Sequence, residues 1–134
     1  MPAQRAGHAR VIFDAPAFHE DLQRTTDTGR SVALQTRSAY ERDGCPVEDL
    51  IACDSEAQDG TRLQGCAKVY LPSPAGRFGM VFEINRQAGS LVLAYLAFGV
   101  RHHPRGSHAL TVYQLAHQRL NGPDSPLDSP RLSS

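Results

Sequence analysis

Long apolar runs are absent from this sequence. No stretch approaches the ~20 consecutive apolar residues of a membrane-spanning helix, and no apolar signal run follows Arg5 and Arg10 near the N-terminus. We therefore expect a soluble, cytoplasmic protein that makes no membrane contact. A chain of 134 residues needs only one hydrophobic core, so we expect a single folded domain.

Cysteine is also scarce. The chain has three cysteines, Cys45, Cys53 and Cys66. Their odd number and the lack of CxxC spacing exclude an obvious disulfide framework or zinc site. We expect reduced and partly buried thiols.

Histidines cluster after the last apolar segment, at His102, His103 and His108. No carboxylate or cysteine lies beside them in the sequence, which disfavours a metal site, and we expect no cofactor. The favoured interpretation is a solvated basic loop, including Arg105, that contacts RNA phosphates. A neutral imidazole is alternatively an acid or base near pH 7.

The formal net charge is zero, but the two signs are segregated along the chain. Six arginines accompany eleven acidic residues up to Thr61, whereas seven basic residues accompany Glu83 alone between Arg62 and Gly122. Such a segregated field favours an anionic partner on one face. Alternatively, the basic and acidic segments pair with each other in the fold.

The N-terminal half predicts one strand and two helices. Residues 10–14 are β-branched and aromatic and stop at Asp14, a good N-cap, so a strand leads into a helix that ends near Arg24. A second helix is expected over residues 30–43, and residues 47–51 suggest one or two further helical turns.

The C-terminal half predicts a three-strand antiparallel meander from Gly65 to Val100. Residues 77–85 alternate between apolar and other side chains, 86–89 form a hairpin turn, and the next strand is apolar on both faces. Ser107 is expected to cap a short C-terminal helix. The fold class is therefore α+β, with residues 1–122 as one domain and 123–134 as a disordered tail rich in proline and serine.

The motifs between Leu63 and Leu120 resemble the RelE/ParE superfamily of bacterial toxins. Members commonly have a Leu and Gly pair, a Lys-bearing strand, a strand ending in Val-aromatic-Glu-Ile and a Val-Gly-x-Arg strand end. The corresponding segments are Leu63 with Gly65, 68–71, 81–84 and 98–101, followed by 112–113, and the opening RVIFDAPAFHEDL is similar to the family's first strand and helix. The resemblance implies a curved antiparallel sheet backed by two N-terminal helices.

Two functions follow from this resemblance. RelE-like members are metal-independent endoribonucleases that cut mRNA in the ribosomal decoding site, whereas ParE-like members inhibit DNA gyrase and cleave nothing. Both kinds are normally silenced by a cognate antitoxin protein. We expect an mRNA interferase that acts on the ribosome; the alternative is a non-catalytic binder of gyrase, nucleic acid or the ribosome.

Cleaving RNA without a metal requires a base, cations that hold the phosphorane, and an acid. By position, the resemblance implies these roles for Lys68, Arg101 and Tyr113. Lys68 is the only lysine of the chain, and a lysine crowded by cations can lose its proton. Alternatively, its charge only prevents an edge strand from pairing with another chain. Arg101 can hold a phosphate bidentately. Tyr113 could stack on a base, act as the acid or join the core.

Two positions depart from the family pattern. Gly79 stands where many RelE-like nucleases carry an arginine, and Tyr70 stands at a lysine-like position. Arg77 lies two residues before Gly79 on the same face of the strand, so we expect it to replace the missing cation as a catalytic residue. Tyr70 is expected to contact RNA, as a base or a stacking platform.

Overall fold

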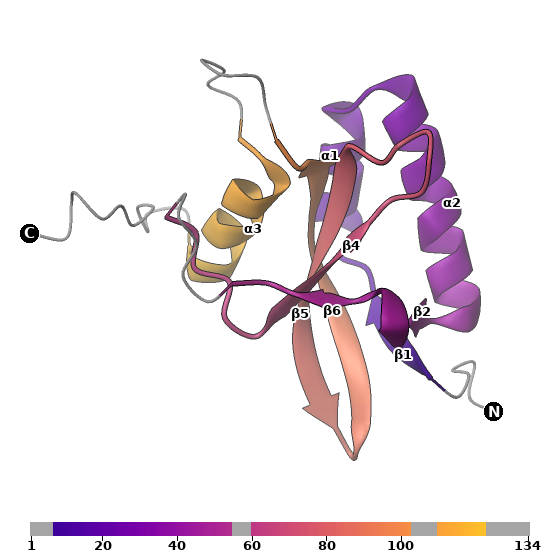
Figure 1. Ribbon diagram of the computed structural model, residues 1–134, viewed down its shortest axis with the longest axis vertical. Helices are drawn as coiled ribbons and strands as arrows, with labels where there is room; N and C mark the ends of the chain where they lie inside the picture. The colour runs from indigo at the N-terminus through magenta and orange to yellow at the C-terminus, as the bar shows by residue number, and fades with distance from the viewer. Residues whose placement is uncertain (1–6, 55–59, 103–109, 123–134) are drawn as a thin grey trace, which may run out of the picture.

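A curled six-stranded sheet organises the molecule (Figure 1). The structure, a computed structural model, describes residues 7–54, 60–102 and 110–122. The strand order is β2-β1-β6-β5-β4-β3. The strands are β1 (His8–Ile12), β2 (Cys45–Pro46), β3 (Ile51–Ala52), β4 (Cys66–Tyr70), β5 (Phe78–Gln87) and β6 (Ser90–Val100). The helices are α1 (Ala15–Gln23), α2 (Asp27–Asp43) and α3 (Val112–Asn121). The α+β class is confirmed.

The β5–β6 hairpin is the centre of the sheet. Phe78, Met80 and Phe82 alternate along β5 and face the core beneath α1 and α2, as the sequence pattern predicts. The turn is tighter than residues 86–89, because β5 runs to Gln87 and β6 starts at Ser90. Ala88 and Gly89 both have positive φ angles, 51° and 79°, which is the geometry of a two-residue turn matched to the twist of the strands.

The expectation of a purely antiparallel sheet is wrong, because β1 runs parallel to β6. Arg10 lies opposite Val92 and Ile12 lies opposite Ala94. A strand that is apolar on both faces needs a neighbour on each side, and β6 has β5 on only one of them. β1 pairs with the other side of β6, and the connection between them, which runs through α1, α2 and strands β2 to β5, is long enough to produce a parallel pair.

The two N-terminal helices begin at side-chain caps and cover one face of the sheet. Asp14 accepts a hydrogen bond from the Ala17 backbone N–H at 3.1 Å, as expected for an N-cap. Thr26 does the same for Gly29 at 3.0 Å. Because of this cap, α2 begins at Asp27, three residues earlier than predicted.

The helical turns expected over residues 47–51 are confirmed only in part. A single 3₁₀ turn spans Val47–Asp49, where the Leu50 N–H donates to the carbonyl of Val47 at 3.1 Å. The chain then pairs antiparallel with β4 as β3, with Ile51 opposite Lys68. Pairing with β4 gives this backbone partners that another isolated helical turn would lack.

The last helix begins later than predicted and lies on the opposite side of the sheet from α1 and α2 (Figure 1). It begins at Val112, where Thr111 and Gln114 form a reciprocal capping box, so Ser107 is not its N-cap. Val112 and Ala116 pack on Val81 and on the small side chain of Ala97. This second core fixes α3 above β4, β5 and β6.

Residues 103–109 and 123–134, which include Ser107 and the predicted tail, lie outside the described residues. Among the helices that the structure describes, none combines the length and apolar character needed to cross a membrane.

Candidate functional site

The face of β4 that lies on the α3 side carries polar side chains next to the second core. Cys66, Lys68 and Tyr70 alternate on this face, whereas Val69 and Leu71 belong to the core under the N-terminal helices. Cys66 is buried, Lys68 is half-buried and Tyr70 is 43% exposed. The strand therefore leads from the core to the surface, with Lys68 in the middle.

Lys68 lies between two tyrosine rings. Its Nζ atom is 4.8 Å from the ring centre of Tyr113 on α3 and 5.8 Å from that of Tyr70 on its own strand. Both distances are within the range of a cation–π interaction. The capping box at the start of α3 places Tyr113 one residue into the helix, directly after the buried Val112. Lys68 and Tyr113, both predicted as site residues, are thus brought together.

Arg101 reaches the same group from the end of β6. Its guanidinium carbon lies 3.8 Å from the ring centre of Tyr70, and its Nη1 atom donates to the carbonyl of Gly76 at 2.9 Å. Its backbone N–H donates to the carbonyl of Arg77 at 2.9 Å. Lys68 and Arg101 therefore both lie close to the ring of Tyr70, on a partly exposed surface.

Gly79 makes this arrangement possible. It lies opposite Tyr70 on β4 and opposite Gly99 on β6. A Cβ atom at position 79 would lie 3.2 Å from Cγ of Arg101 and 3.3 Å from the carbonyl oxygen of Val69. The stem of Arg101 thus fills the space that a side chain at position 79 would need. The cation expected next to position 79 is therefore present, but it is Arg101, which follows the end of β6.

The cations of this cluster are not neutralised within the part of the chain that the structure describes, because Lys68 and Arg101 form no ion pair with a carboxylate there. Four of the N-terminal arginines instead pair with nearby acids of their own half: Arg24 with Glu20, Arg30 with Asp27, Arg37 with Glu41, and Arg42 with Asp43. Burial raises the pKa of Tyr113, while Lys68 and Arg101 act in the opposite direction. Tyr113 is therefore a protonated hydroxyl at neutral pH, next to two positive charges.

Arg77 does not occupy the position expected of it. Its guanidinium carbon lies 5.5 Å from the ring centre of Phe78, a side chain that packs in the core under α1 and α2. The cation that the structure places beside Gly79 is Arg101. His102 is exposed at the end of the described segment, and His103 and Arg105 lie outside the described residues.

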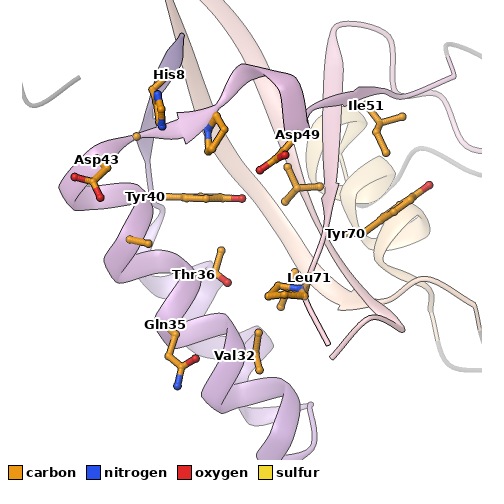
Figure 2. Close-up of a pocket in the computed structure, with 15 residues that line it drawn as sticks. His8, Val32, Gln35, Thr36, Tyr40, Asp43, Asp49, Ile51, Tyr70 and Leu71 are labelled. Atoms are coloured by element: carbon orange, nitrogen blue, oxygen red, sulfur yellow. The ribbon is translucent and has the colours of Figure 1, made fainter. Parts of the chain in front are cut away.

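A groove of about 580 Å³ adjoins the cluster and was not predicted from the sequence. Figure 2 shows Tyr40 and Asp43 of α2 on one side of it, with Ile51 and Tyr70 on the other. Asp49 adds a second carboxylate to its lining. Tyr70 thus belongs both to the cationic cluster and to a groove lined by acidic and apolar side chains.

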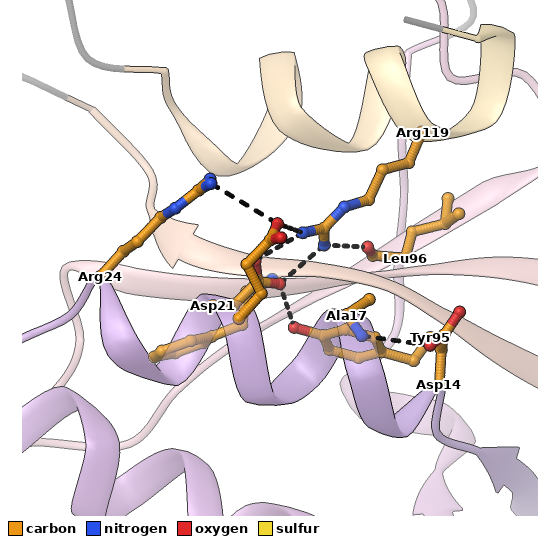
Figure 3. Close-up of polar contacts among 9 residues, drawn as sticks. Asp14, Ala17, Asp21, Arg24, Tyr95, Leu96 and Arg119 are labelled. Atoms are coloured by element: carbon orange, nitrogen blue, oxygen red, sulfur yellow. Dashed lines mark hydrogen bonds and ion pairs between the residues drawn. The ribbon is translucent and has the colours of Figure 1, made fainter.

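A largely buried ion pair that was not predicted from the sequence joins α3 to α1 (Figure 3). Arg119 donates to both carboxylate oxygens of Asp21, each at 2.7 Å, and to the carbonyl of Leu96 at 2.7 Å. Asp21 also accepts hydrogen bonds from the Tyr95 hydroxyl at 2.5 Å and from the Phe98 N–H at 3.1 Å. The sequence does contain a signal for this ion pair. Asp21 follows Phe18 by three residues, so its carboxylate lies on the apolar side of an amphipathic helix, where a charge needs a partner.

This ion pair also completes the edge of the sheet. β1 is in register with β6 only as far as Ala94, so the β6 backbone beyond that residue needs other partners. Arg119 and Asp21 supply them at Leu96 and Phe98. The position of α3, and with it the position of Tyr113, depends on this contact.

Comparisons of the chain with protein-family models, curated proteins and solved structures found no match. Within residues 7–54, 60–102 and 110–122, no three histidine, cysteine or acidic side chains gather as metal ligands.

Proposed function

We propose that the protein is an RNA-binding toxin of the RelE/ParE type that cleaves mRNA without a metal. The observation that carries the proposal is the position of Lys68 and Arg101 around Tyr70, on one face, with no carboxylate partner among the described residues. Two cations beside an exposed aromatic ring form a surface suited to single-stranded nucleic acid, since the cations bind phosphates and the ring stacks on a base.

The order of elements further supports this proposal. A strand followed by two helices that back a curled sheet is the arrangement implied by the family resemblance, and β1, α1 and α2 have this arrangement. The segments that resemble the family lie on β4, β5 and the end of β6, where the cluster forms.

Each member of the cluster has a role in the proposed reaction. Arg101 and Lys68 stabilise the charge that develops on the phosphorane. Tyr113, held protonated, donates a proton to the departing 5′-oxygen, a role worth about 10²- to 10⁴-fold in rate. Lys68 is the base that takes the proton of the 2′-hydroxyl. His102 and the basic residues that follow it extend the phosphate contacts.

The partners in this proposal are mRNA on the ribosome, in the cytoplasm, and a cognate antitoxin. An antitoxin would be encoded beside this gene as a small, acidic, helix-rich protein. Co-expression with that neighbour should yield a complex and restore growth.

Induced expression in a bacterium tests the proposal. The wild type should arrest translation and produce new 5′ ends in mRNA, mapped by primer extension. Arg101→Ala and Lys68→Ala should both relieve the arrest and remove the new ends. Persistent cleavage in both variants would reject this site.

A second candidate, a binder of the same fold without turnover, is favoured by one observation. The guanidinium of Arg101 is already stacked on Tyr70 and bonded to the carbonyl of Gly76, which leaves fewer donors for a phosphorane. Growth arrest with a DNA damage response and intact mRNA would identify this candidate as a gyrase inhibitor. Arrest with neither signal would indicate a nucleic-acid or ribosome binder.

A further inference from the structure

Cys53 and Cys66 lie opposite each other where β3 meets β4. Ala52 is opposite Ala67 in this antiparallel pair, so the next position in the same register places Cys53 opposite Cys66. The Cys53 backbone N–H donates to the carbonyl of Cys66 at 3.0 Å, which shows that the register continues. Side chains at directly opposed positions of an antiparallel pair point to the same face of the sheet.

The two thiols also share one environment. Cys66 is 2% exposed in the core beneath α3, and Cys53 is partly exposed and packs against the same core. The pair shares one hydrogen bond, because the Cys66 N–H donates to the carbonyl of Leu63 at 3.1 Å. Directly opposed antiparallel residues have Cα atoms about 4.5–5.5 Å apart, within the roughly 4.4–6.8 Å range of disulfides. Both thiols are free in this structure.

We propose that Cys53 and Cys66 form a reversible disulfide by exchange with a low-molecular-weight disulfide, which fastens the edge strand β3 to β4 beside Lys68. β3 is only two residues long, so a covalent bond at its end limits its separation from the sheet. Lys68 lies two residues after Cys66 on the same face. The modification thus restrains the strand that carries Lys68, whether or not the cluster binds RNA.

The exchange proceeds in two steps. The Cys53 thiolate, on the more exposed side chain, attacks one sulfur of the small disulfide and displaces one small thiolate. The Cys66 thiolate then attacks Sγ of Cys53, forms the internal bond and displaces the second small thiolate. Two cysteine thiols are oxidised, one small disulfide is reduced to two thiols, and the two cysteine protons end on these leaving groups.

The electrostatics determine the rate and the order of attack. Burial raises the pKa of Cys53 to about 11 and that of Cys66 to about 12, and Lys68 acts against the rise at Cys53. The thiolate fraction grows about tenfold per pH unit below the pKa. Closure is therefore slow near pH 7 and about tenfold faster at pH 8.5 than at pH 7.5.

Cys45 is the internal control. It lies on β2, at the opposite edge of the sheet from β3, and it is fully buried. Oxidised glutathione added to the full chain at pH 8.5 should remove two hydrogen atoms from the mass, leave the thiol of Cys45 free and yield one crosslinked peptide that contains Cys53 and Cys66. Dithiothreitol should reverse the change.

Two variants separate closure from nonspecific oxidation. Cys45→Ser should close at the wild-type rate, whereas Cys66→Ser should stop at a mixed disulfide on Cys53. If Cys66→Ser fails to fold, Cys53→Ser provides the same comparison, with neither closure nor glutathione uptake at Cys66. A stable glutathione adduct on wild-type Cys53, or a bridge that includes Cys45, would overturn the proposal. None of these outcomes depends on RNA binding.

Discussion

The guanidinium carbon of Arg101 lies 3.8 Å from the ring centre of Tyr70, the distance of a face-to-face stack. This contact links the two positions where the chain departs from the RelE-like pattern. Gly79 leaves space for the aliphatic part of the Arg101 side chain, and the guanidinium of Arg101 lies over the ring of Tyr70. The two departures therefore compensate for each other, since one residue removes a side chain and the other provides a surface for the cation that replaces it.

Removal of the Arg101 guanidinium should weaken RNA binding more than the loss of an equal charge elsewhere. Arg101→Ala should lower affinity for a single-stranded RNA by about 1–3 kcal/mol, because a phosphate contact and the orientation of Tyr70 are both lost. Arg86→Ala is the matched control, since Arg86 lies exposed near the β5–β6 turn. Equal losses in the two variants, measured by fluorescence anisotropy, would refute a localised site.

A methyl group at position 79 should damage the site without removing any charge. In Gly79→Ala the new Cβ meets Cγ of Arg101 at 3.2 Å and the Val69 carbonyl oxygen at 3.3 Å, so Arg101 must move. Gly99→Ala, on the neighbouring strand, meets only ordinary contacts, the nearest of them Cβ of Val112 at 3.7 Å. RNA affinity should fall in Gly79→Ala and stay unchanged in Gly99→Ala. The reverse order would contradict the role assigned to Gly79.

Tyr113→Phe should separate cleavage from binding. If Tyr113 is the acid, its loss should slow single-turnover cleavage by about 10²- to 10⁴-fold and change RNA affinity only slightly. Because burial raises the pKa of Tyr113 above the ordinary value of a tyrosine, the hydroxyl keeps its proton at neutral and mildly basic pH. Deprotonation of this group should therefore cause no fall in wild-type rate between pH 6 and 9. An unchanged rate in the variant would exclude Tyr113 as the acid.

Asp21→Asn should destabilise the whole fold. The substitution removes the buried carboxylate charge that Arg119 binds, leaves Arg119 with the exposed Glu20 as its remaining acidic partner, and weakens the hydrogen bonds at the edge of β6. Breaking a fully buried pair costs about 3–5 kcal/mol of unfolding free energy, and the remaining contact of Arg119 with Glu20 makes this the upper limit for Asp21→Asn. Arg24→Ala, which removes the exposed partner of Glu20 at 3.5 Å, should cost less than about 1 kcal/mol. Urea unfolding of both variants measures the difference.

Local patterns predicted the elements that depend on nearby residues. The alternation along β5 and the cap at Asp14 were both confirmed. The parallel pairing of β1 with β6 was not predicted, because it joins segments about eighty residues apart and leaves no local pattern. The late start of α3 was missed because the sequence offers Ser107 and Thr111 as competing caps, and only the capping box with Gln114 distinguishes them.

The candidate site could be predicted in part. Family resemblance pointed to Lys68, Tyr70, Arg101 and Tyr113, and the structure brings these four together. Strand periodicity alone did not place the Arg77 guanidinium, because Arg77 precedes the first residue of β5 and its guanidinium lies against Phe78. The function of Gly79 could not be seen without the path of Arg101, although a glycine inside a strand often marks a close approach.

The salt dependence of RNA affinity tests the central claim most directly. A plot of log Kd against log salt for the wild type should be steep, and Lys68→Ala combined with Arg101→Ala should reduce its slope by roughly 0.7 for each lost phosphate contact. A flat response for the wild type, or an unchanged slope in the double variant, would show that this face does not contact the nucleic acid.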